Sequence, residues 1–194
     1  MATRAPADIV LGQSGFGQDG FACGPSAMHH PETLWTAGGK LVVADSANNR
    51  VLIWKKIPTV SGQPPDLVLG QGDLNTCVIN NDGSGAKGGA PTAASFSFPA
   101  GVWTDGKRLV VNDYHNCRVL IWKKFPKHNF QPANRVLGQP DFTCAVENND
   151  GSGTCSEGSP SAQNLGCPEG ISQIGNRLIV DDTCDNRYLI YKAK

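Results

Sequence analysis

The chain has 194 residues, and its 17 lysines and arginines balance its 17 aspartates and glutamates, so the formal net charge is zero. This balance argues against a surface for nucleic acid or anionic membranes, because such a surface needs an excess of lysine and arginine. No stretch approaches the roughly 18 consecutive apolar residues of a membrane-spanning helix. The 23 glycines and 13 prolines instead favour short strands joined by many turns.

The first segment, MATRAPADIVLGQ at 1–13, lacks the apolar region of a signal peptide and leads directly into a repeated tetrad. We expect this segment to belong to the fold. The protein is then either cytoplasmic or a mature, exported part of something larger.

One segment is written three times, as LVVADSANNRVLIWKK at 41–56, LVVNDYHNCRVLIWKK at 109–124 and LIVDDTCDNRYLIYK at 178–192. A proline-led segment precedes each copy, and a VLGQ tetrad recurs at 10–13, 68–71 and 136–139. Self-similarity at a fixed long period is typical of units that stack and bury their faces against one another.

Each unit predicts four short antiparallel strands. The proline-led segment supplies the first, which ends in the second unit at the turn dipeptide Asp105-Gly106. A β-branched run supplies the second strand, and a polar turn rich in asparagine and aspartate connects it to the third. The VLGQ tetrad supplies the fourth. Four antiparallel strands in order, repeated, are typical of the blades of a β-propeller.

The pattern PxGVxxDGxxLxVxDxxNxRVLIW resembles the NHL repeat, a blade motif of β-propellers. The segments SGQPPDLVLGQ and RVLGQPDF resemble the long NHL-like repeats of bacterial proteins. The resemblance extends over nearly the whole chain from Asp8 onward. It implies an all-β, single domain over 1–194, with blade units at about 31–71, 99–139 and 168–192 plus 8–13.

Counting strands leaves the third unit one strand short, whereas Ile9-Val10-Leu11 is a fourth-strand sequence without a unit of its own. Three blades also fall below the usual four to eight of a ring. Two chains related by a two-fold axis would make six blades, each N-terminal strand completing the partner's last blade. We therefore predict a closed homodimer of three plus three blades. The alternative is a fragment of a longer NHL-repeat protein.

An aspartate and an arginine recur at a five-residue spacing in the turn of every unit. The pairs are Asp45 with Arg50, Asp113 with Arg118, and Asp182 with Arg187. A catalytic residue rarely needs three equivalent copies, whereas a structural residue needs one in each unit. We predict ion-pair clamps that hold the turns, capped by Asn48, Asn116 and Asp185.

Polar and aromatic residues gather where the innermost strands should begin, at the mouth of a central channel. They are His30, Glu32, Trp35, Trp103, Cys167 and Glu169. His30, Glu32, Cys167 and Glu169 offer ligands for zinc or copper, and the tryptophans offer a ring face to a sugar or cation. The alternative is that these positions serve packing. Calcium is a further candidate for the NNDGSG loops at 80–85 and 148–153, but these lack the full EF-hand pattern and also suit polar turns.

Seven cysteines are present and none forms a CxxC motif. Cys144 and Cys155 are the pair best placed to form a disulfide in an oxidising compartment, and the alternative is a set of small buried thiols. The odd count leaves at least one cysteine unpaired within the chain.

No GxSxG, HExxH, P-loop or dinucleotide fingerprint occurs. The leading hypothesis is therefore a non-catalytic binding or scaffold propeller without a cofactor, which binds a protein or a small molecule. The resemblance implies a second hypothesis, a six-bladed enzyme of the lactonase or amidating-lyase type that holds calcium or zinc in its channel.

Overall fold

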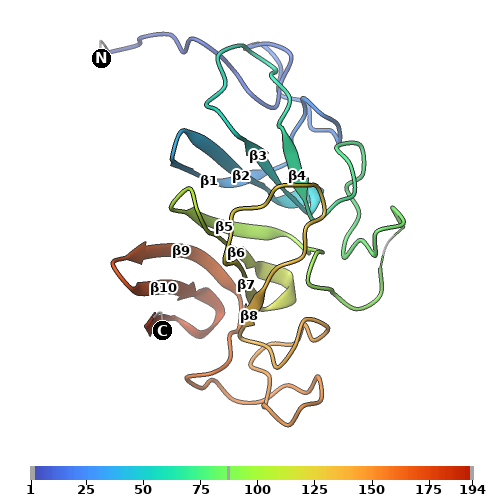
Figure 1. The fold of residues 1–194 in the computed structure, drawn as a ribbon, viewed down its shortest axis with the longest axis vertical. Coiled ribbons are helices and arrows are strands. Elements are labelled where there is room, and N and C mark those ends of the chain that lie inside the picture. Colours follow the sequence, from blue (N-terminus) through green and yellow to red (C-terminus); the bar gives the residue numbers. More distant parts are fainter. Residues whose placement is uncertain (1–2, 87, 193–194) are drawn as a thin grey trace.

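The computed structural model describes residues 3–86 and 88–192 and contains three antiparallel sheets in a row (Figure 1). The first sheet contains β1 (Pro31–Ala37), β2 (Lys40–Asp45), β3 (Arg50–Trp54) and β4 (Leu67–Leu69). The second contains β5 (Pro99–Thr104), β6 (Leu109–Asp113), β7 (Arg118–Trp122) and β8 (Arg135–Leu137). The third contains β9 (Pro168–Ile174), β10 (Arg177–Asp182) and β11 (Arg187–Lys192). The all-β prediction is confirmed, and no described helix is long and apolar enough to cross a membrane.

A single 3-10 turn joins the second and third strands of each sheet. These turns are η1 (Ser46–Asn48), η2 (Tyr114–Asn116) and η3 (Thr183–Asp185). The next residue is left-handed in every case, with φ of 52° at Asn49, 50° at Cys117 and 53° at Asn186. Asparagine tolerates this conformation and cysteine rarely adopts it. The turn sets a register in which each clamp aspartate lies opposite its arginine.

The sheets pack face to face around two apolar cores. Val42, Val51 and Leu69 of the first sheet meet residues of the second sheet, such as Leu109 and Trp122. The core between the second and third sheets contains Trp103, Val119, Leu178 and Val180. Strands β1, β5 and β9 lie next to one another along the row (Figure 1). Gly101 permits this approach, because an added Cβ would lie 2.4 Å from the Glu169 carbonyl oxygen.

The N-terminal segment differs from its prediction. Residues 9–11 do not form a strand in the described structure. They lie beside the loop between β3 and β4, where Val10 N–H donates to Ser61 Oγ at 3.2 Å and Gly62 N–H donates to the Val10 carbonyl at 2.9 Å. A strand needs a paired neighbour, and this segment finds none among the described residues. Its Leu11 nevertheless packs with Met28 on the outer face of the first sheet.

Candidate functional site at the turn edge

Buried ion pairs hold the turn of each sheet. Arg50 Nε lies 2.7 Å from Asp45 Oδ2, Arg118 Nε lies 2.8 Å from Asp113 Oδ2, and Arg187 Nε lies 2.8 Å from Asp182 Oδ2. The first two pairs are fully buried, and the third is partly exposed at its arginine. The structure therefore places the six clamp residues together as the sequence predicts.

Each clamp also ties distant loops to its turn. The Arg118 guanidinium donates to the carbonyls of Phe142 at 2.6 Å, Thr92 at 2.9 Å and Ser95 at 3.0 Å. Burial raises the pKa of the Asp113 carboxyl, and the neighbouring Arg118 opposes that shift. With its donors and acceptors engaged inside the protein, this pair has a structural role.

The turns and the residues just before β1, β5 and β9 lie along one edge of the sheets, which we call the turn edge. Four of the predicted channel-mouth residues lie on it: His30, Glu32, Cys167 and Glu169. His30 Nδ1 is 3.0 Å from Glu32 Oε1, and the Thr183 hydroxyl donates to Glu169 Oε2 at 3.1 Å. The structure thus pairs His30 with Glu32 and places Glu169 on the third sheet with a different partner.

An aromatic cluster, missed by the sequence analysis, joins the first two sheets at the turn edge. The Phe98 ring centroid is 5.9 Å from that of His30, 5.0 Å from His115 and 6.2 Å from Tyr114. His30 and His115 are exposed, and Phe98 and Tyr114 are half-buried. Part of the signal was present in the sequence, since His30 and Phe98 occupy aligned positions directly before the prolines of consecutive units.

The two tryptophans do not belong to this edge. Trp103 is buried between the second and third sheets, and the Arg108 guanidinium lies 5.6 Å from its ring centroid. Trp35 is half-buried and packs against both cores. Each is four residues along its strand from the first proline, about 13 Å from the turn edge at 3.3 Å per residue. The tryptophan rings therefore lie away from the turn edge, and their role as a ligand surface stays a prediction.

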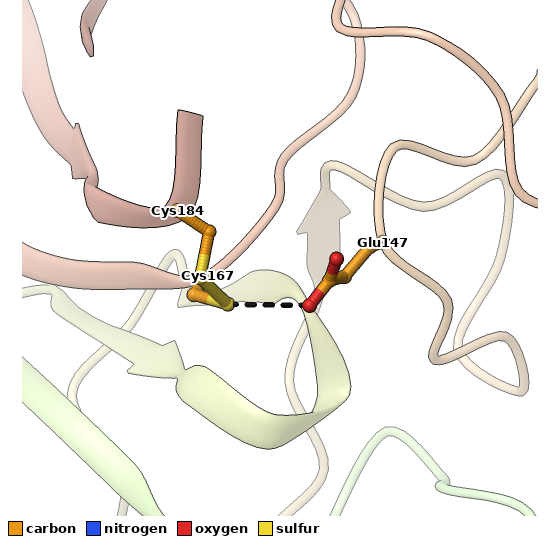
Figure 2. A group of neighbouring side chains, drawn as sticks. All are labelled: Glu147, Cys167 and Cys184. Atoms are coloured by element: carbon orange, nitrogen blue, oxygen red, sulfur yellow. Dashed lines mark hydrogen bonds between the residues drawn. A yellow bond between two sulfur atoms is a disulfide. The ribbon is translucent and has the colours of Figure 1, made fainter. Parts of the chain in front are cut away.

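In the third sheet, a disulfide between Cys167 and Cys184 occupies the positions aligned with the Phe98 and His115 ring contact. Figure 2 shows Glu147 beside it, with Glu147 Oε1 at 3.5 Å from Cys167 Sγ. A disulfide sulfur carries no proton, so this contact becomes a hydrogen bond only in the reduced form. The ligand atoms of the three residues lie within 4.8 Å of one another. These residues could bind zinc only if both cysteines were thiolates beside the Glu147 carboxylate. In the disulfide, neither sulfur is a thiolate.

Two further disulfides stabilise the loops. Cys144 is joined to Cys155, the pair that the sequence suggested, and Cys23 is joined to Cys77 over a separation of 54 residues. Cys117 is buried and has no disulfide partner in the described chain. Burial, reinforced by the Glu147 carboxylate, raises the pKa of the Cys117 thiol to about 12. This thiol is neutral and unreactive at ordinary pH.

The aspartates of the NNDGSG loops accept hydrogen bonds from within their own loops. Asp82 Oδ1 accepts hydrogen bonds from the hydroxyl and the N–H of Ser84, and Asp150 Oδ1 accepts one from Ser152 N–H. Hydrogen bonding by the Ser84 and Ser152 side chains, followed by that of their backbone N–H groups, lowers the pKa of the Asp82 and Asp150 carboxyls. The buried Asn81 donates to Gln71 at 2.7 Å. The geometry supports the polar-turn alternative over a calcium loop.

Comparison with known proteins adds little to this geometry. No family model matches the chain, and no match is found among curated proteins. Among solved structures, the computationally designed Ika4 protein aligns over 98% of this chain and 99% of its own, with 10% identity and a TM-score of 0.40. A likeness of this size carries no argument, so the function must be inferred from the turn edge and the repeated sheets.

Proposed function

We propose that the chain is a non-catalytic binding module of the β-propeller type, with NHL-like blades, and that the turn edge is its contact surface. The observation that carries this proposal is the exposed aromatic cluster around Phe98. Clustered aromatic side chains with polar tips are typical of the centres of protein interfaces. The charged pairs of the first two clamps are fully buried, so they do not contribute to this surface.

A regular step between the sheets supports the propeller. An added Cβ at Gly70 would meet Phe96 at 2.4 Å, and one at Gly138 would meet Leu165 at 2.6 Å. These contacts join the end of one unit to the next unit at aligned positions, so consecutive sheets are related by the same kind of step. Equal steps between equal units generate either a ring or an open helix. We propose a ring completed by a second copy, as a homodimer of three plus three sheets.

Panning a displayed random-peptide library on the purified protein tests the binding function. Selected peptides should bind the wild type with a micromolar Kd in calorimetry. They should lose at least tenfold in affinity with Phe98→Ser or His115→Ser, because these changes remove the aromatic contact surface. Lys107→Ser, a change in the hairpin turn between β5 and β6, serves as the matched control. If the selected peptides bind both turn-edge variants with the same Kd as the wild type, the turn edge is not the contact surface.

A metal-dependent enzyme of the lactonase or lyase type is the second candidate. It is favoured by the His30 and Glu32 pair and by Glu169 on the same edge. Elemental analysis of protein dialysed against calcium or zinc separates the two functions. One equivalent of metal that is lost in Glu32→Gln or Glu169→Gln would favour the enzyme, and an absence of bound metal would favour the binding module.

A further inference from the structure

The two ends of the row expose apolar side chains where the repeat elsewhere buries them. Tyr188 and Ile190 of β11 are 69% and 60% exposed, although the aligned Val51 and Ile53 of β3 are fully buried. At the other end, Leu34 of β1 is 62% exposed, whereas the aligned Val102 of β5 is buried. Exposed apolar faces and an open strand edge favour association. If the third sheet of one copy lay next to the first sheet of another copy, as consecutive sheets do within the chain, these two faces would meet.

The N-terminal segment already lies where a preceding sheet would place its fourth strand. Leu69 packs in the core between the first and second sheets, Leu137 packs in the next core, and Leu11 packs on the outer face of the first sheet. The glycine after each leucine is left-handed, with φ of 86°, 87° and 82°. An added Cβ at Gly12 would meet the Met28 side chain at 2.9 Å, as the Gly70 and Gly138 contacts do one and two units later.

The backbone groups of this segment are set for pairing. The Val10 N–H donates to Ser61 Oγ, and the Val10 carbonyl accepts a hydrogen bond from Gly62 N–H. In the same way, the N–H of the aligned Val68 in β4 donates to Asn129 Oδ1 and its carbonyl accepts from Phe130 N–H, each at 3.0 Å. Backbone groups of successive residues in an extended segment face alternate sides. Those of Ile9 and Leu11 therefore face the side on which β4 pairs with β3, and they have no partners among the described residues.

A buried hydroxyl of the third sheet lacks a hydrogen-bond acceptor among the described residues. The Tyr191 hydroxyl is buried and has no hydrogen-bond partner in the described chain. The aligned Trp54 and Trp122 donate their indole N–H to the carbonyls of Gln63 and Gln131, each at 3.0 Å. Both glutamines stand directly before a proline in QPPDLVLGQ and QPANRVLGQ.

The N-terminal segment reads APADIVLGQ, with Ala5 at the glutamine position. Its Asp8 aligns with Asp66, which accepts a hydrogen bond from Lys55 N–H at 2.7 Å, and with Asn134, which accepts one from Lys123 N–H at 2.9 Å. The segment therefore carries the two acceptors that β11 needs: a carbonyl for Tyr191 and a carboxylate for the N–H of Lys192.

Resting on the propeller proposed above, we propose that residues 5–11 of a second copy form the fourth strand of the third sheet. Leu11 of the second copy lies opposite Tyr188, Val10 opposite Leu189 and Ile9 opposite Ile190, as Leu69, Val68 and Leu67 lie opposite their partners in β3. The exchange is reciprocal about a two-fold axis. It brings the β11 face of each copy against a groove of the other copy, lined by Leu11, Met28, Leu34, Leu41 and Val43.

Cross-linking the full chain tests this register. Val10 and Leu189 would form a directly opposed, non-hydrogen-bonded pair with Cα atoms about 4.5 Å apart, within reach of a disulfide. Val10→Cys combined with Leu189→Cys should give a covalent dimer on oxidation, seen on non-reducing gels. Neither single variant should do so, nor should Val10→Cys with Ile190→Cys, which is one residue out of register. No dimer with the matched pair, or equal yields from both pairs, would overturn the register.

Light scattering of the unmodified chain should give twice the 20.5 kDa chain mass. Tyr191→Phe should weaken the dimer by about 5- to 150-fold, since it removes one hydrogen bond at each of two junctions. A stable monomer would overturn the inference. Peptide binding at the turn edge is an independent readout: its failure in a correctly cross-linked dimer would refute the binding function alone.

Discussion

Arg118→Ala tests whether the buried clamp is structural. The side chain is fully buried, and its removal leaves the Asp113 carboxylate without its counter-ion and three loop carbonyls without a donor. Breaking a buried ion pair by removing one partner costs about 3–5 kcal/mol. For a domain of this size, that loss lowers the midpoint of thermal unfolding by about 6–20 °C. Differential scanning calorimetry and urea titration measure both quantities.

Two matched variants show how the loss of unfolding free energy depends on the exposure of the arginine that is removed. Arg187 is 24% exposed, so Arg187→Ala should cost less than Arg118→Ala because water can solvate the remaining Asp182. The Arg108 side chain is 40% exposed beside Asp105, and Arg108→Ala should cost at most about 1 kcal/mol. Adding Asp113→Ala to Arg118→Ala should recover part of the loss, because the uncompensated buried charge is then gone. Equal costs for Arg118→Ala and Arg108→Ala would refute the reasoning.

Three further predictions follow from the loops and turns. The pKa of the Cys117 thiol is raised to about 12, so iodoacetamide at pH 8 should alkylate this residue only in denaturant and not in the native protein. Intact-mass measurement distinguishes the two, and labelling of the native protein would contradict the burial of this thiol. Removing the Cys144 and Cys155 disulfide by a double serine variant should cost about 3 kcal/mol for its 11-residue separation, which urea titration measures, and unchanged stability would argue against the bridge. Gly138→Ala should destabilise the chain by well over the roughly 1 kcal/mol expected at Gly151, since both are left-handed but only Gly138 also faces Leu165; equal costs would show that the close approach is unimportant.

The repeat allowed much of the local structure to be predicted. Apolar, β-branched runs followed by polar turns predicted the hairpins, because both signals are local in sequence. The clamp between Asp113 and Arg118 was predictable for the same reason, since its spacing recurs in every unit. The VLGQ tetrads correctly predicted β4 and β8. The N-terminal tetrad does not form a strand, because no described strand lies beside it to pair with its backbone.

Features that depend on the packing between units escaped prediction. The Cys23 and Cys77 disulfide joins the N-terminal segment to the loop after β4, and nothing local in the sequence links these positions. The aromatic cluster joins Phe98, which directly precedes β5, to Tyr114 and His115 of η2, and the 3-10 form of this turn was not anticipated. Trp103 was assigned to the mouth because its strand is innermost, although its position along that strand places it in the core.

The place of the N-terminal segment has a consequence for the evolution of this chain. Each VLGQ tetrad packs against the sheet that follows it in the chain, since Leu11 packs on the outer face of the first sheet, Leu69 in the core between the first and second sheets, and Leu137 in the core between the second and third. Inserting or deleting one period of 68 residues, the spacing of Asp45 and Asp113, would therefore change the number of sheets and keep the same kind of contact between neighbours. Descendants of such a chain would vary in the number of sheets by whole units without any new junction having to arise.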